Sequence, residues 1–265
     1  MMRHKIKWII LLLLAAVFIY SGVQLYRSVM EYKVGTDEYD MLAQDVYADT
    51  LPPVVPAGFE PDMGGQEDEE ETQEQEQQDA ALSFDIGHEK LREINKDYIG
   101  WIAMNDQINY PVVQGSDNTY YLTHTFYGTQ NKAGTIFMAA ENEEGWDAKN
   151  IIIYGHNIKN NTMFATLMQY EDQAFFEQHR YFSIYTEEGV SVYGIFAAFR
   201  TGETSEAYQY GFADDEDFMN YIALMQSWSV IDTGMRVGKD DQIITLSTCT
   251  NVNNGRFIVQ GKKIE

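Results

Sequence analysis

QIITLSTCTNVNNGRFIVQGKKI, residues 242–264, contains two apolar runs separated by a short polar segment. Each run is rich in β-branched residues, which favour extended strands, and the Asn and Gly residues between them are typical of a turn. If this segment is a hairpin, its strands are adjacent and antiparallel. Cys249 then ends the first strand, close to Arg256, which opens the second.

The chain upstream of this hairpin repeats the same pattern of short apolar runs bounded by Gly, Asn or Asp. Six further strands are predicted, at residues 100–104, 110–114, 134–139, 150–154, 181–185 and 190–200. Eight short strands with few helices predict a mainly β protein with a closed or nearly closed eight-stranded barrel. Helical spacing of apolar residues predicts a helix before the barrel and helical inserts within it, at residues 84–97, 118–123, 163–170, 172–179 and 214–228.

The N-terminus carries one long apolar segment. Residues 8–26 contain no charged side chain, and at ~1.5 Å per residue a helix of this length nearly spans a hydrocarbon layer of ~30 Å. We expect a single transmembrane helix here, with residues 1–7 cytoplasmic because Arg3, Lys5 and Lys7 precede it. A cleaved signal peptide is the alternative. A juxtamembrane helical segment is predicted at residues 27–49.

Acidic residues dominate the composition, with a formal net charge of −23. Residues 60–79 contain no basic and no aromatic side chain, and such a stretch cannot bury enough apolar surface to fold. Residues 50–82 are therefore predicted to be a disordered linker, interpreted as a stalk between the membrane and a globular domain at residues 83–265. The chain shows no basic patch interleaved with aromatic residues, which argues against nucleic acid as a partner.

Cys249 is the only cysteine in the chain. The apolar N-terminal segment places the domain outside the cytosol, where cysteines usually occur in disulfide pairs. A lone thiol in that setting is either a nucleophile or a buried residue acting as a small hydrophobe. As a nucleophile it needs a proton acceptor and donors that stabilise negative charge on the attacked carbonyl oxygen.

His156 is the best candidate for the proton acceptor. It follows the predicted strand at residues 150–154, where a rigid scaffold presents side chains to loops. The other histidines precede the membrane segment, lie in predicted helices or occupy a polar, aromatic-rich stretch: His4, His88, His179 and His124.

Arg256 is the candidate donor. Its guanidinium is a permanent cation with a rigid fork of N–H groups that suits a carbonyl oxygen or an oxyanion. The alternative is a structural ion pair with a carboxylate. The sequence has no HExxH, no paired cysteine, no EF-hand loop and no glycine-rich phosphate loop, so no metal and no cofactor are predicted.

Three motifs together resemble the class B sortases. They are TLSTC, followed by an arginine that opens the last strand; YGHN at residues 154–157; and YPVVQGSDNTYYL at residues 110–122. The likeness extends over residues 91–264 and includes GHNIKNNTMFATLMQY, from Gly155 onward. One departure is the segment between Cys249 and Arg256, which is short for this class.

The resemblance implies the sortase β-barrel and a membrane-anchored cysteine transpeptidase of a Gram-positive bacterium, in the plasma membrane with its catalytic domain extracellular. Such an enzyme cuts the C-terminal sorting motif of a secreted protein and joins the new carboxyl end to an amine of a peptidoglycan stem peptide, or to a pilin. By motif, Cys249 is the nucleophile, His156 the general acid and base, and Arg256 the donor to the oxyanion. Residues implied to bind substrate are Asn118, Leu122, Tyr154, Ser247 and Thr250.

Two other functions remain open from the residues alone. One is a cysteine protease that hydrolyses its substrate without transferring it. The other is an extracellular β-barrel that acts as a binding module or adhesin, with Cys249 structural.

Overall fold

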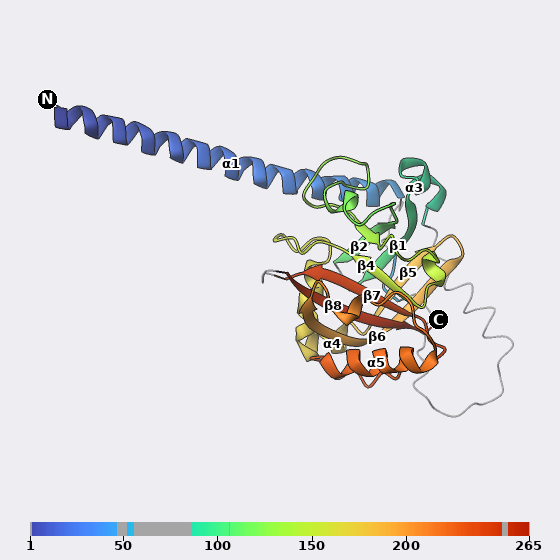
Figure 1. The fold of residues 1–265 in the computed structure, drawn as a ribbon. Helices are drawn as coiled ribbons and strands as arrows, with labels where there is room; N and C mark the ends of the chain where they lie inside the picture. The colour runs from blue at the N-terminus through green and yellow to red at the C-terminus, as the bar shows by residue number, and fades with distance from the viewer. Residues whose placement is uncertain (1, 47–51, 56–85, 106, 251–253, 265) are drawn as a thin grey trace.

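The computed structural model describes residues 2–46, 52–55, 86–105, 107–250 and 254–264. Its centre is a closed barrel with the strand order β1-β2-β3-β4-β7-β8-β6-β5, in which β5 pairs with β1 to complete the circle (Figure 1). The strands are β1 (Tyr98–Met104), β2 (Ile108–Val113), β3 (Ile136–Met138), β4 (Asn150–Tyr154), β5 (Tyr181–Thr186), β6 (Gly189–Gly202), β7 (Ile243–Cys249) and β8 (Gly255–Lys263). All eight predicted strands are present, with ends that differ by no more than two residues from the prediction.

Helices and 3-10 turns lie around the barrel. They are α1 (Met2–Val46), α3 (His88–Ile94), η1 (Tyr120–Leu122), η2 (Gly145–Asp147), η3 (Ala165–Glu171), α4 (Gln173–Gln178), η4 (Glu206–Tyr208) and α5 (Asp215–Trp228). The predicted helix at residues 84–97 is shorter in the structure, and its first two residues lie outside the described part. It ends because Asn95 adopts an extended backbone, and the Asn95 side chain donates to the carbonyl of Phe126 at 2.9 Å.

Helix α5 covers the outer face of the barrel (Figure 1). Its N-terminus is capped by the Asp214 carboxylate, which accepts the backbone N–H of Asp217 at 2.9 Å. Three acidic residues in the first turn are favourably placed against the helix dipole. Apolar residues at helical spacing face the barrel and pack against Phe196, Phe199 and Ile258: Phe218, Tyr221, Ile222 and Met225.

Strand β7 is buried on both faces because it has the barrel interior on one side and the α5 cluster on the other. Leu246 belongs to the interior cluster, whereas Ile243 packs with α5. Every residue of β7 is buried except the last, Cys249, which is exposed. Its small polar residues Thr245, Ser247 and Thr248 are therefore buried together with its apolar ones.

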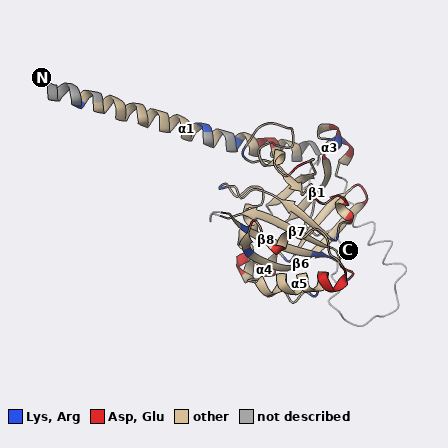
Figure 2. Ribbon diagram, viewed as in Figure 1, with Lys and Arg blue, Asp and Glu red and all other residues tan. Residues whose placement is uncertain are grey.

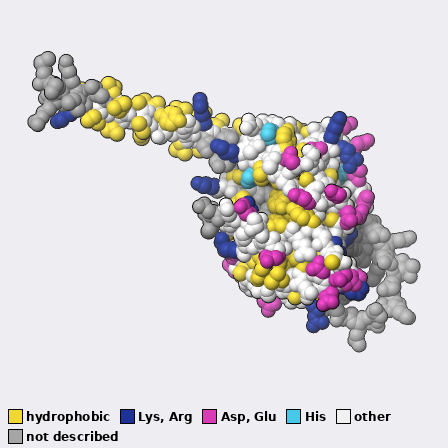
Figure 3. Space-filling view, viewed as in Figure 1, with side chains coloured by type: hydrophobic (Ala, Val, Ile, Leu, Met, Phe, Trp, Pro, Cys, Tyr) yellow, Lys and Arg dark blue, Asp and Glu magenta, His cyan; other side chains and the backbone are white. Residues whose placement is uncertain are grey.

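Helix α1 extends away from the barrel (Figure 1). Its segment Ile10–Arg27 has a mean hydropathy of 1.7 and none of it is buried, so by length and composition this helix is able to cross a membrane. Apolar side chains surround its outer half in Figure 3, and charged residues flank that stretch in Figure 2. The same unbroken helix continues through most of the predicted juxtamembrane segment to Val46.

The interpretation of the acidic segment as a stalk stays a prediction. The chain already contacts the barrel before that segment, since Tyr39 and Leu42 of α1 are buried in the main core cluster. Just after α1, the carbonyls of Pro53 and Val54 accept hydrogen bonds from Tyr185 and Ser183 of β5, each at 2.6 Å. The acidic residues themselves lie outside the described residues. Through Tyr39 and Leu42, α1 itself reaches the barrel, so one continuous helix connects the apolar segment to it.

Candidate active site

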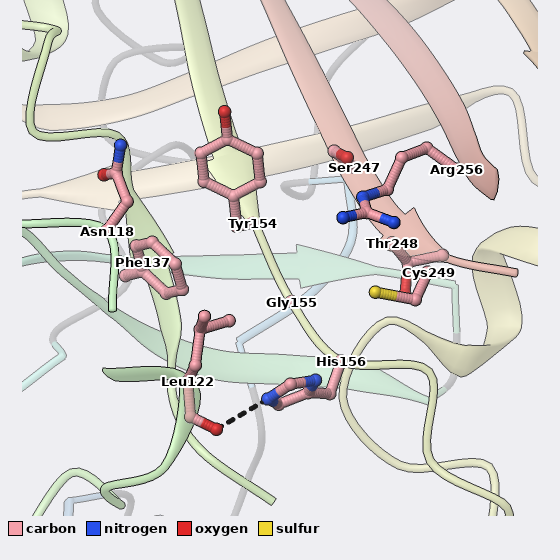
Figure 4. Close-up of a pocket in the computed structure, with 10 residues that line it drawn as sticks. All are labelled: Asn118, Leu122, Phe137, Tyr154, Gly155, His156, Ser247, Thr248, Cys249 and Arg256. Carbon is pink, nitrogen blue, oxygen red and sulfur yellow. Dashed lines mark hydrogen bonds between the residues drawn. The ribbon is translucent and has the colours of Figure 1, made fainter. Parts of the chain in front are cut away.

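The site lies where strands β4 and β7 end and strand β8 begins. Tyr154 of β4 is paired in parallel with Ser247 of β7, and Cys249 of β7 lies directly opposite Arg256 of β8 in the antiparallel ladder. Directly opposed residues have Cβ atoms about 5 Å apart on one face of a sheet. The predicted hairpin is therefore confirmed, and it brings the thiol and the guanidinium to one corner (Figure 4).

Cys249 is accessible at this corner. The strand before it is buried, and its own side chain is exposed, so the alternative of a buried hydrophobic cysteine is excluded. The Asn157 side chain donates to the carbonyl of Cys249 at 3.0 Å and so holds the end of β7 against the loop after β4. The thiol is thus presented on a fixed backbone, as a nucleophile requires.

His156 follows β4 and Gly155 and faces the same hollow. Its backbone is fixed, because the Gly155 N–H donates to the carbonyl of Ser247 at 3.1 Å and the Phe164 N–H donates to the carbonyl of His156 at 2.9 Å. In the side chain, Nε2 lies 2.7 Å from the carbonyl oxygen of Leu122. A carbonyl only accepts, so this contact assigns the proton to Nε2 and leaves Nδ1 to exchange protons. Figure 4 shows Nδ1 on the side of the ring away from Leu122, where Cys249 lies.

Arg256 is oriented by two acceptors. Its guanidinium donates to Glu203 Oε2 at 3.2 Å and to the carbonyl of Gly255 at 3.1 Å. The Arg256 side chain is 24% exposed, and the Glu203 carboxylate is 44% exposed, so water screens this ion pair. The contact with Glu203 sets the direction of the fork and leaves the guanidinium beside Cys249 (Figure 4).

A hollow of about 160 Å³, open to solvent, joins these three residues to a groove. Its lining is Asn118, Leu122, Phe137, Tyr154, Gly155, His156, Ser247, Thr248, Cys249 and Arg256. Four of the five predicted substrate residues are in this set, and Thr250 is not: its backbone N–H donates to the carbonyl of Gly255 at 3.0 Å and closes the hairpin. Phe137, Gly155 and Thr248 line the hollow and were not predicted as site residues, although Gly155 and Thr248 lie inside the YGHN and TLSTC motifs.

Tyrosines form the wall beside β4 and β7. Tyr208 hydrogen-bonds the Ser247 hydroxyl at 2.8 Å, and Tyr154 hydrogen-bonds the hydroxyl of Tyr210 at 3.2 Å. Burial raises the pKa of Tyr154 and of Tyr208 above the usual range, so both remain neutral at physiological pH. Figure 3 shows apolar side chains gathered on the surface over β4 and β7. Tyr208 and Tyr210 were missed because only the fold brings the segment after β6 to this wall.

Two predicted groove residues, Asn118 and Leu122, contribute to the hollow in different ways. The Asn118 side chain is already engaged, since it donates to Glu141 at 2.6 Å and accepts the Ala140 N–H at 2.8 Å. It therefore shapes the groove. Leu122 contributes both its side chain to the lining and its carbonyl to His156.

The remaining candidates lie elsewhere. His124 stacks on Tyr120 with ring centroids 4.1 Å apart, and His88 Nδ1 is 2.7 Å from the Tyr98 hydroxyl. Neither lines the hollow. Across the described ranges, no three His, Cys, Asp or Glu side chains are grouped as metal ligands.

Comparison with known proteins places this geometry in a family. The model of the sortase domain matches residues 103–264. The chain belongs to the sortase family. It is 38% identical over 180 residues to sortase B of Listeria monocytogenes, covering 66% of this chain and 72% of that protein. It is 34% identical over 181 residues to sortase B of Staphylococcus aureus, covering 67% of this chain and 74% of that one.

Solved structures agree with the sequence matches. A Staphylococcus aureus sortase B–substrate complex aligns with a TM-score of 0.64 and 34% identity, over 67% of this chain and 84% of that chain. A Bacillus anthracis sortase B complex with AAEK1 aligns with a TM-score of 0.70 and 28% identity, over 89% and 99%. The chain is thus a sortase of the B type, a cysteine transpeptidase that acts in sorting proteins to the cell wall. The comparisons favour neither the protease nor the adhesin alternative.

In this sortase, replacing Arg256 with alanine is expected to lower kcat by about 10²–10³-fold, the usual effect of removing one oxyanion donor. Arg256→Lys keeps the charge but loses the fork, so it is expected to restore little activity. The measurement is the rate of release of the C-terminal fragment from a sorting-signal substrate. Arg200→Ala is the matched control, because Arg200 pairs with Glu171 away from the hollow. Equal rates in Arg256→Ala and Arg200→Ala would remove Arg256 from the mechanism.

Proposed function

We propose that Cys249, His156 and Arg256 carry out the transpeptidation, and that the groove from Asn118 to Ser247 binds the sorting motif. The observation that supports this is their convergence. One thiol, one imidazole with a fixed tautomer and one guanidinium border a single open hollow, and each comes from a strand end.

In the first half-reaction, the Cys249 thiolate attacks the carbonyl carbon of the scissile peptide bond. Negative charge develops on the carbonyl oxygen, where Arg256 donates hydrogen bonds. The C–N bond then breaks, and the leaving amine takes a proton from the imidazolium of His156. The product is a thioester between Cys249 and the new carboxyl end of the substrate.

In the second half-reaction, an acceptor amine attacks the thioester. Neutral His156 takes a proton from this amine, the C–S bond breaks, and Cys249 leaves as a thiolate. A new amide bond joins the sorted protein to the acceptor, and the enzyme returns to its starting state. We propose an amine of a peptidoglycan stem peptide as the acceptor, with a pilin amine as the second candidate.

The acceptor assignment is supported by a relative. A sortase B complexed with triglycine aligns with this chain at a TM-score of 0.63 and 35% identity, over 67% of this chain and 85% of that chain. Triglycine carries a free, unhindered amino group, the type of nucleophile that a thioester requires. We further propose that the apolar part of α1 anchors the enzyme in the plasma membrane with the barrel outside, where secreted proteins and the cell wall are accessible.

The experiment that tests the function is a partition of the acyl-enzyme between water and an amine. The full chain is incubated with a secreted protein that carries its C-terminal sorting signal, with and without triglycine. The masses of the products are then measured by mass spectrometry. A transpeptidase yields the triglycine amide as the main product when the amine is present. A free carboxyl product alone, at saturating amine, would instead identify a hydrolase.

A further inference from the structure

Helix α1 meets the barrel through one narrow face. Gly35, Tyr39 and Leu42 recur at intervals of four and three residues, so they share one side of the helix, and all three are buried. We call these residues the docking face. At Gly35 a Cβ atom would lie 3.0 Å from the Asn131 side chain, so the helix backbone is close to the barrel. Figure 1 shows this end of α1 against the loops between β2 and β3.

Tyr39 makes the polar contacts of the docking face. Its hydroxyl donates to the carbonyl of Gly134 at 2.7 Å and lies 3.1 Å from Thr135 Oγ1. It also accepts the backbone N–H of Phe126 at 3.3 Å. Burial raises the pKa of Tyr39 far above its usual range, so the hydroxyl keeps its proton for this contact. One side chain of α1 therefore joins both ends of the segment from Phe126 to Thr135.

Gly134 lies directly against the imidazole of His156. Its φ is +61°, and a Cβ atom there would be 3.0 Å from His156 Cδ2 and 3.0 Å from the Leu122 carbonyl oxygen. That oxygen is the acceptor of His156 Nε2. The neighbouring Thr135 N–H donates to the carbonyl of Tyr121 at 2.9 Å, which ties the two stretches together. The carbonyl that accepts the hydrogen bond of Tyr39 thus belongs to Gly134, the residue that lies against the histidine.

The ring of Tyr39 provides a second, indirect connection to His156. It packs edge-on against Tyr110 with ring centroids 5.4 Å apart. The Tyr110 hydroxyl accepts the backbone N–H of Met163 at 3.3 Å. Met163 is bridged to Asn157 and is followed by Phe164, whose N–H donates to the carbonyl of His156. Through Tyr110 and Met163, the ring of Tyr39 is therefore also connected to Phe164, which holds the backbone of His156.

We propose that Tyr39 is a positioning residue for His156, so that docking of the membrane-side helix is part of the active-site architecture. The proposal rests on the catalytic role given to His156 above. It makes α1 more than an anchor. The helix that carries the apolar segment also fixes Gly134 and Thr135, which pack beside His156 and are tied to the stretch whose Leu122 carbonyl selects the histidine tautomer. A chain that lacks the docking face is then expected to hold the same barrel with a less ordered histidine.

The test uses alkylation of Cys249, which is the only cysteine of the chain and needs no knowledge of the sorting motif. The full chain in detergent micelles is treated with iodoacetamide, and the rate is followed from pH 5 to pH 10. Tyr39→Phe removes only the hydroxyl. It is expected to change the rate in the neutral range by about three- to ten-fold, the size of one lost buried hydrogen bond, and to alter the shape of the pH profile. Met41→Ala, an exposed residue on the same stretch of helix, is the matched control.

A double-mutant cycle separates positioning from a general loss of structure. If Tyr39 acts through His156, Tyr39→Phe has no further effect on the alkylation profile in a His156→Gln background. The proposal is overturned if Tyr39→Phe matches Met41→Ala, or if its effect persists in full without His156. An unchanged profile in His156→Gln itself would contradict the role of the histidine. If the alkylation profile changes in His156→Gln but not in Tyr39→Phe, only the coupling to α1 is contradicted.

A second measurement covers the case in which Tyr39→Phe lowers stability. The ring N–H of His156 is observed by NMR in the chain labelled with ¹⁵N-histidine, at a temperature well below unfolding of every variant. A protected Nε2–H signal is expected in the wild-type chain and in Met41→Ala. Faster exchange of this proton is expected in Tyr39→Phe, and equal protection in all three would overturn the proposal.

Discussion

Replacing Cys249 with alanine is expected to abolish thioester formation and to lower turnover by about 10⁴-fold or more, because no other group in the hollow supplies a comparable nucleophile. The side chain is exposed at the end of β7, so its loss leaves the barrel core intact. The measurement is the mass of the enzyme after a short incubation with a sorting-signal substrate. The wild-type chain carries the acyl group, and the alanine variant does not.

Chemical modification provides the matched control for this variant. Cys249 is the only cysteine, so treatment of the wild-type chain with iodoacetamide blocks this position alone among thiols. Alkylated wild-type enzyme and Cys249→Ala are expected to be equally inactive, with unchanged thermal unfolding. Transfer activity retained by Cys249→Ala would show that another residue attacks the substrate.

Replacing His156 with glutamine is expected to lower kcat/KM by about 10²–10⁴-fold, the usual contribution of a general acid and base. Glutamine can keep a hydrogen bond to the Leu122 carbonyl but cannot shuttle a proton. Two groups that exchange protons take part in the proposed reaction, so the wild-type kcat/KM is expected to fall on both sides of a pH optimum. The His156→Gln profile is expected to lose one limb of this bell.

His124→Gln is the control for that experiment. His124 lies in the segment between β2 and β3, where it stacks on Tyr120 and does not line the hollow. Its replacement is expected to change kcat/KM by no more than about two-fold, as for most surface positions. If both histidine variants lose activity equally, or if His156→Gln keeps a two-limbed profile, the proton transfer belongs to another group.

Local patterns were sufficient to predict the barrel strands. Strand β4 was visible as three isoleucines between an asparagine and a tyrosine, and β7 as an apolar run ending at Cys249. Both strands are buried on two faces, and such strands appear as short continuous runs whatever their partners. The opposition of Cys249 and Arg256 followed from the same local reasoning, because a hairpin pairs residues that are close in sequence.

The docking of α1 shows the limit of local reasoning. The composition of the acidic segment predicts a linker, but composition does not tell which flanking segment contacts the barrel. The contacts of Tyr39 with Gly134 and of Tyr185 with Pro53 join residues 95 and 132 positions apart. Only the folded chain brings such residues together, so the docking of α1 could not be inferred from spacing.

The sequence by itself was enough to select the side chains that we propose for the reaction of this sortase: one thiol, one histidine at a strand end and one arginine across a hairpin. The tertiary structure alone decided how these groups are held. The Leu122 carbonyl selects the tautomer of His156, Glu203 directs Arg256, and Tyr39 supports the loop beneath the histidine. The physical reason is that reactive groups are properties of single residues, whereas hydrogen bonds between distant segments exist only after the barrel closes.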